Sequence, residues 1–186
     1  MKTRGLWLGA LLLGSGVWVG TVVAQDKPAL PAMPAWMQVG AKQKALEKFV
    51  GVFEISNDDP ALALSGTCRN RMLWGGRAMR SDVTGSAMGM DFTGEYTLTY
   101  SNAYQQYQAV WLDSMAPHIF FSTGIDKDGG IEFTSVDPNQ LTGKPSPGRA
   151  TLKWKDNDTY VLEFFTTRDG KEARMGAFTY TRVKKK

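Results

Sequence analysis

The chain contains a single histidine, His118, and it follows two other side chains that often take part in catalysis. Asp113 and Ser114 precede it within the stretch AVWLDSMAPHIFF. A hydrolytic triad needs a base that lies between the nucleophile and the orienting acid. Three neighbours on one short loop rarely reach that arrangement. We therefore favour a connection between two strands, with Asp113 and His118 at the mouth of a barrel, over a hydrolytic site.

Metal and cofactor chemistry is also weakly supported by these residues. Catalytic zinc usually takes three protein ligands, often histidines, and this chain has one histidine. Asp126 and Asp128 resemble part of a calcium loop but lack its other carboxylates, and a hairpin turn accounts for them. Haem held through His118 stays a minor alternative, since methionines on alternating strands more often fill a core. We expect no metal and no cofactor.

The N-terminal residues resemble a targeting signal. Lys2 and Arg4 precede an apolar run at residues 6–23, and Ala24 ends a Val-x-Ala sequence. This pattern predicts a secretory signal peptide over residues 1–24, with an uncleaved anchor as the alternative. The prediction places the protein outside the cytoplasm, secreted or periplasmic, with no stable membrane span after cleavage.

The rest of the chain divides into a linker and one domain. Prolines at 28, 31 and 34 predict an extended linker over residues 25–36, and residues 37–186 suit a single domain. Cys68 is the only cysteine, so no internal disulfide is possible and we expect a buried thiol. The formal net charge is +4, and the basic residues are scattered among acidic ones. They do not form the basic stripe that nucleic-acid binding requires, so we expect no nucleic-acid partner.

Hydrophobic periodicity predicts one helix followed by many strands. Apolar residues recur at helical spacing over residues 38–50, which predicts a short amphipathic helix that Gly51 ends. Beyond it the period is two, most clearly over residues 88–100 and less cleanly over 68–74, 104–112, 150–154 and 160–166. Turn residues stand between the runs, as at Gly75-Gly76, Asp128-Gly129 and Asp169-Gly170. Roughly nine or ten such strands remove their edges by closing into an antiparallel up-and-down β-barrel, which the helix caps.

Two sets of residues carry a resemblance to known families. Gly51 and Phe53 in KFVGVFEI, with Arg182 in YTRV, resemble the lipocalin-like (calycin) barrels. In those barrels a tryptophan stands where this chain has Phe53, and the arginine packs on it. The pieces LEKFVGVFE, SGTCRNRMLWGGR, GMDFTGEYTLTY and DGKEARMGAFTYTR resemble the mostly secreted bacterial family called domain of unknown function 1579. This resemblance implies a lipocalin-related fold over residues 42–182 and supplies no activity.

Strand parity predicts which side chains face the barrel interior. Eight positions share the parity of apolar neighbours and form the candidate ligand-binding set: Asn70, Met72, Ser81, Met90, Phe92, Tyr96, Tyr107 and Trp111. Met88 shares this parity, whereas Arg69 and Arg71 have the opposite parity and should lie outside. A barrel of this size either holds one small ligand or fills with its own side chains, and the sequence leaves both open.

The leading functional hypothesis is therefore a non-enzymatic protein that binds a small apolar or amphipathic molecule in the barrel interior. The alternative is an envelope protein with a filled core that binds another protein through its exterior or mouth loops. A hydrolase or a haem-binding barrel comes third.

Overall fold

The structure, a computed structural model, describes residues 32–58, 64–138, 142–168 and 170–184. The predicted signal peptide and most of the predicted linker lie outside these residues. In the part of the chain that is described, no helix is long and apolar enough to cross a membrane.

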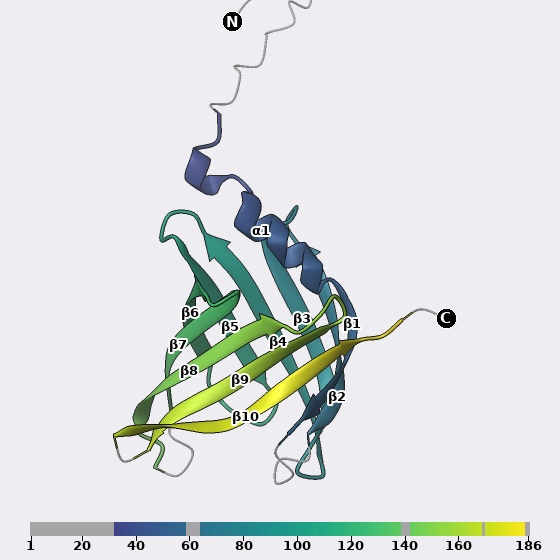
Figure 1. Cartoon of the computed structure of the whole chain (residues 1–186), viewed down its shortest axis with the longest axis vertical. Helices are drawn as coiled ribbons and strands as arrows, with labels where there is room; N and C mark the ends of the chain where they lie inside the picture. The colour runs from purple at the N-terminus through teal and green to yellow at the C-terminus, as the bar shows by residue number, and fades with distance from the viewer. Residues whose placement is uncertain (1–31, 59–63, 139–141, 169, 185–186) are drawn as a thin grey trace, which may run out of the picture. The chain divides into compact units, whose positions relative to one another are not determined.

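A short helical segment precedes the strands. It comprises the 3₁₀ turn η1 (Ala35–Met37), the helix α1 (Ala41–Ala45) and the 3₁₀ turn η2 (Leu46–Phe49). Leu46 and Phe49 are buried, so the predicted amphipathic helix is present and shorter than predicted. The segment lies across one end of the strands, which is called the helix end below, and the opposite end is called the far end (Figure 1).

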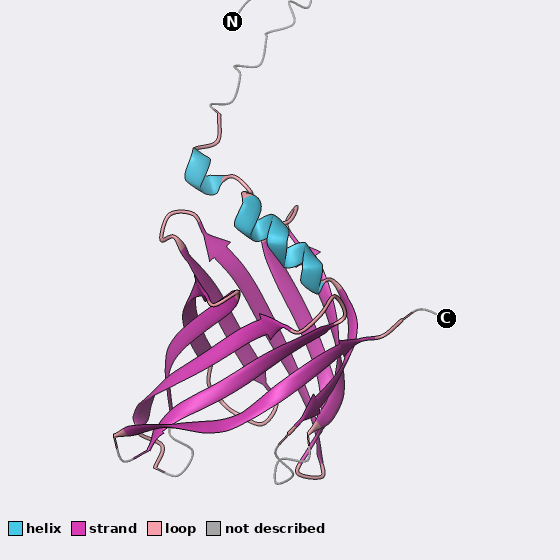
Figure 2. Cartoon of the chain, viewed as in Figure 1, coloured by secondary structure: helices cyan, strands magenta, loops and turns pink. Residues whose placement is uncertain are grey.

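The described strands form one closed antiparallel sheet (Figure 2). They are β1 (Gly51–Asn57), β2 (Ser65–Leu73), β3 (Ala78–Ala87), β4 (Met90–Ser101), β5 (Gln106–Asp113), β6 (Phe120–Lys127), β7 (Gly130–Pro138), β8 (Pro145–Trp154), β9 (Thr159–Arg168) and β10 (Lys171–Arg182). Each strand pairs with its neighbours in sequence, and β1 pairs with β10 to close the barrel. This is the predicted up-and-down, lipocalin-like barrel.

The closing seam carries the contact that the lipocalin resemblance implied. Phe53 on β1 pairs with Arg182 on β10, and the Arg182 guanidinium carbon lies 4.5 Å from the centre of the Phe53 ring. Arg182 also donates hydrogen bonds to the carbonyls of Val50 and Lys48, at 2.6 and 2.7 Å. One side chain therefore joins the last strand, the first strand and the end of the helical segment.

Gly51 makes this junction possible. Its φ is 143°, a conformation that a residue with a side chain rarely adopts. A Cβ added there would lie 2.6 Å from a guanidinium nitrogen of Arg182. The glycine that ends the predicted helix thus also leaves room for the arginine.

Charged side chains form networks on the outside of the barrel. Arg71 and Arg80 both bind Asp82 across β2 and β3, and Arg80 also binds Glu95 on β4. Arg69 is likewise exposed. The predicted outward parity of Arg69 and Arg71 is confirmed.

Candidate functional site

Cross-strand register shows which side chains share the inner face of the barrel. Asn70 on β2 pairs with Ser81 on β3, and Ser81 pairs with Tyr96 on β4. Tyr96 pairs with Trp111 on β5, which pairs with Phe120 at the start of β6. Residues directly opposite each other on neighbouring strands point to the same face of a sheet. These residues are called the interior row below; the row begins with Phe120 at the far end and leads to Asn70.

Most predicted interior positions agree with this register. Four are buried: Asn70, Ser81, Phe92 and Tyr107. Three are half-buried and pack against the buried core: Met72, Tyr96 and Trp111. Their inward orientation follows from the sequence pattern, and a ligand contact at any of them stays a prediction.

The prediction for Met88 is wrong, and Met90 is exposed although it has the predicted inward parity. Their exposed fractions are 54% and 52%. Met88 has a φ of 52° and Gly89 a φ of 74°, so the two form a tight turn at the far end and the strand begins only at Met90. Met90 has inward parity, but its position at the rim leaves the side chain in solvent.

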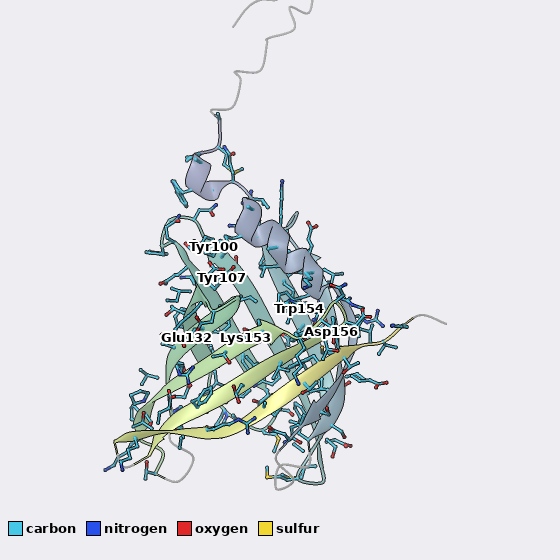
Figure 3. All side chains as sticks on the ribbon, in the orientation of Figure 1. Tyr100, Tyr107, Glu132, Lys153, Trp154 and Asp156 are labelled. Carbon is cyan, nitrogen blue, oxygen red and sulfur yellow. The ribbon has the colours of Figure 1, made fainter. Side chains whose placement is uncertain are left out.

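Aromatic side chains fill the interior at the helix end. The Phe49 ring of η2 lies 4.9 Å from the Trp154 ring and 5.1 Å from the Tyr160 ring. Phe53 lies 5.1 Å from Tyr160, with the rings close to perpendicular. Trp154 lies beside the end of the helical segment (Figure 3). The two contacts of Tyr160 are edge-to-face, a preferred geometry of aromatic pairs, and together these rings fill this end of the barrel.

Inward-facing side chains nearer the far end keep part of their surface accessible. Along β9 the inward positions change from buried Tyr160 to half-buried Leu162 and Phe164. These inward side chains are therefore only partly covered by the rest of the barrel. The half-buried apolar side chains on the inner faces of β5, β6, β9 and β10 are called the accessible interior surface below: Trp111, Phe120, Leu162, Phe164 and Phe178.

This surface lies on one side of the barrel. On the other side, inward residues remain buried towards the far end, as Ile55, Val83 and Phe92 show. Phe164 and Phe178 face each other with ring centres 5.2 Å apart, which forms an apolar wall. The accessible interior surface is therefore mostly aromatic.

A buried polar cluster lies where the interior row meets the filled helix end. The Asn70 amide nitrogen donates to the Phe49 carbonyl at 3.0 Å and contacts the Tyr160 hydroxyl at 3.4 Å. The Asn70 carbonyl oxygen Oδ1 is buried and accepts no hydrogen bond from any described residue. A buried polar atom left without a partner costs about 1–3 kcal/mol. Among the described side chains, this oxygen and His118 Nε2 are buried in this way.

Phenols and a thiol surround this amide. Tyr160 and Tyr180 stack with ring centres 4.4 Å apart. Burial raises the pKa of Tyr96, Tyr160 and Tyr180, and the neighbouring Cys68 and Tyr96 raise that of Tyr180 further. Burial likewise raises the pKa of the Cys68 thiol. The cluster is therefore neutral, and the buried thiol is not poised as a nucleophile.

The loop that carries the histidine does not form a triad. Asp113 accepts a hydrogen bond from the Trp111 indole at 2.6 Å and from the backbone of Met115 and Ala116 at 2.8 Å. The Ser114 hydroxyl accepts from the backbone N–H of Thr93 at 3.1 Å. These bonds shape the loop and orient Trp111.

His118 lies apart from both of these groups. Its ring lies 4.1 Å from the Phe120 ring, and its Nε2 atom is buried without a partner among the described residues. Within those residues, no three histidine, cysteine or carboxylate side chains are grouped as metal ligands would be. The alignment that hydrolysis needs is therefore not formed by the described residues of this loop.

Most residues of the accessible interior surface lie outside the set predicted from the sequence. Leu162 and Phe164 flank polar Glu163 and share the parity of Tyr160 on β9, and Phe178 pairs with Leu162, so all three face inward. Their exposure depends on how far the barrel walls stand apart. Strand parity alone does not predict the distance between the walls.

Comparison with known proteins gives the following relationships. The family described as "Protein of unknown function (DUF1579)" matches residues 38–182, which span α1 to β10. No match was found among curated proteins. Among solved structures, the chain is similar to the S-type phycobiliprotein lyase CPES from Guillardia theta, with a TM-score of 0.48 and 14% identity. That similarity covers 77% of this chain and 93% of the lyase chain.

Proposed function

We propose that this chain, which belongs to the DUF1579 family of proteins of unknown function, binds a small apolar or amphipathic molecule inside its barrel. The observation that carries the proposal is the accessible interior surface, because inward aromatic side chains such as Phe164 and Phe178 keep exposed area. An apolar pocket with a few placed polar groups is the usual form of a small-molecule site. The alternative, a protein-binding barrel with a filled core, predicts that these side chains are buried.

The proposed role is non-enzymatic. Asp113 and Ser114 are engaged by backbone groups or Trp111, and His118 makes no hydrogen bond to either. The apolar lining can exclude water and hold a ligand, and no described group is placed to activate one. We further propose that binding takes place outside the cytoplasm, on the basis of the signal-like residues 1–24.

A pair of variants on β6 tests interior binding. Ser122 faces inward, opposite Ala109 and Ser135, whereas the next residue, Thr123, faces outward. Ser122→Phe should fill the open interior and lower the affinity for Nile red, a neutral apolar dye, by about tenfold or more. Thr123→Phe adds the same ring to the outer face and should leave dye affinity unchanged.

The dye titration has a clear contrary outcome. Wild-type protein that does not bind Nile red, or equal loss in both variants, would argue against an interior site. Organic extraction of the purified protein, followed by mass spectrometry, then identifies any bound lipid or metabolite.

The haem alternative has a separate test. His118 Nε2 carries no hydrogen bond from a described residue, but its ring packs against Phe120 at the far-end loop. We propose that the protein takes no haem, and we expect no shift of the Soret band when haem is added to wild-type protein. A shifted band that disappears in His118→Ala would replace this proposal with haem binding.

A further inference from the structure

We propose that the interior ligand is a neutral amphiphile whose polar end donates a hydrogen bond to Oδ1 of Asn70. This inference rests on the proposed interior binding site and adds the chemistry of the ligand's polar group. Asn70 is only 3% exposed, and the interior row connects it to the far end of the barrel.

The orientation of the Asn70 amide follows from its neighbours. The Phe49 carbonyl can only accept a hydrogen bond, so the nitrogen of Asn70 must face it. The amide oxygen then points away from that carbonyl and has no donor among the described residues. Because a backbone group dictates the orientation, reversing the amide cannot satisfy the oxygen.

The interior row extends along the inner face from the far end to Asn70. Phe120 and Trp111 are half-buried at the far end, Tyr96 follows, and buried Ser81 stands next to Asn70. The Asn70 oxygen itself is sealed from solvent by the surrounding side chains. Because the oxygen is buried, a ligand that binds it must displace one of the side chains that cover it.

Charge selects against ionised ligands. The charged side chains on the inner face, among residues whose side chains are described, lie near the rims: Asp113, Asp137 and Lys171 at the far end, Asp126 and Arg182 at the helix end. No described counter-charge lies beside Asn70, and an unpaired ionised group pays a large desolvation cost in such surroundings. Burial also raises the pKa of the adjacent phenols, which therefore stay neutral. A neutral amide or alcohol fits, and a carboxylate does not.

A series of ligands with one common chain tests this chemistry on the wild-type protein. Dodecanamide donates a hydrogen bond, methyl dodecanoate only accepts, and dodecanoate is anionic at neutral pH. We expect the amide to displace Nile red with an affinity about tenfold or more above that of the ester, and dodecanoate to bind most weakly. Nile red itself lacks a donor, so its binding reports on the interior site alone.

The outcomes separate the two proposals. Equal affinities for amide and ester, or tightest binding of dodecanoate, would overturn the donor inference while Nile red binding upheld the interior site. Absence of binding by Nile red and by all three ligands would instead remove the proposed function.

A substitution assigns the preference to Asn70. Asn70→Leu should abolish the preference for the amide over the ester and leave ester affinity nearly unchanged. Asn157→Leu, at an exposed turn position, is the matched control and should keep the wild-type preference. A preference that persists in folded Asn70→Leu would contradict the assignment; if that variant does not fold, the wild-type series decides.

Discussion

The Arg182 guanidinium lies over the Phe53 ring, 4.5 Å from its centre, at the seam where the last strand meets the first. The same group donates to two carbonyls at the end of the helical segment, Lys48 and Val50. These contacts hold together elements more than a hundred residues apart in sequence. One side chain therefore links the last strand to the first strand and to the helical segment.

Loss of this side chain should weaken the whole fold. Arg182→Ala removes hydrogen bonds from a charged donor and a cation–π contact, and we expect a loss of about 2–4 kcal/mol in the free energy of unfolding. Urea denaturation followed by circular dichroism measures it. The control is Arg69→Ala, which removes an exposed arginine with no bonded partner among the described residues. Equal stability of the two variants would contradict this role.

The lack of a side chain at Gly94 leaves room for the Trp111 ring on the inner face. A Cβ added to Gly94 would lie 2.4 Å from the Trp111 ring, so Gly94→Ala should force the indole to move. We expect a loss of about 1–3 kcal/mol in stability, typical of overpacking, together with weaker Nile red binding. Trp111→Phe should relieve the clash, so the double variant should be more stable than the sum of the single effects predicts. Strict additivity would mean that the two residues do not interact as described.

Stability should fall at high pH because of the buried phenols. Burial raises the pKa of Tyr96, Tyr107, Tyr160 and Tyr180 above the unfolded value of about 10. The folded protein then holds protons that the unfolded chain releases. Their stabilising contribution is complete below about pH 10 and is lost as the pH rises through the folded values.

Two measurements check this pH dependence. Urea denaturation should show lower stability at about pH 11 than at about pH 9. Phenolate absorbance should show these tyrosines titrating only as the protein unfolds. Full phenolate absorbance near pH 10 in folded protein would contradict their burial.

Much of the fold could be predicted from the sequence because strand parity is a local property. The alternation over residues 90–100 places Phe92 and Leu98 on one face whatever the partner strands do. The same alternation wrongly predicts that the strand includes Met88, because Met88 and Gly89 form a turn with positive φ. A Met-Gly pair is a weaker turn signal than Asn-Gly or Asp-Gly.

The accessible interior surface could not be predicted in the same way. Whether Leu162 or Phe178 is covered depends on the number of strands and on their stagger around the closed sheet. The unpaired oxygen of Asn70 depends on the Phe49 carbonyl, which the helical segment brings to the inner face. Both features result from closure of the barrel, which brings together residues that are distant in sequence. Hydrophobic periodicity could therefore identify candidate interior residues, but it could not show which of them are accessible or unpaired.

Leu162 and Val161 on β9 give the most direct test of the central claim. Leu162 faces the interior and Val161 faces outward, so adjacent residues report on opposite faces of one wall. Nuclear magnetic resonance of methyl-labelled protein, titrated with dodecanamide, should shift the Leu162 methyl signals and give ligand contacts to them, with Val161 unchanged. Shifts at Val161 with none at Leu162, or no shift at either under saturating ligand, would show that the interior of the barrel is not where this protein binds.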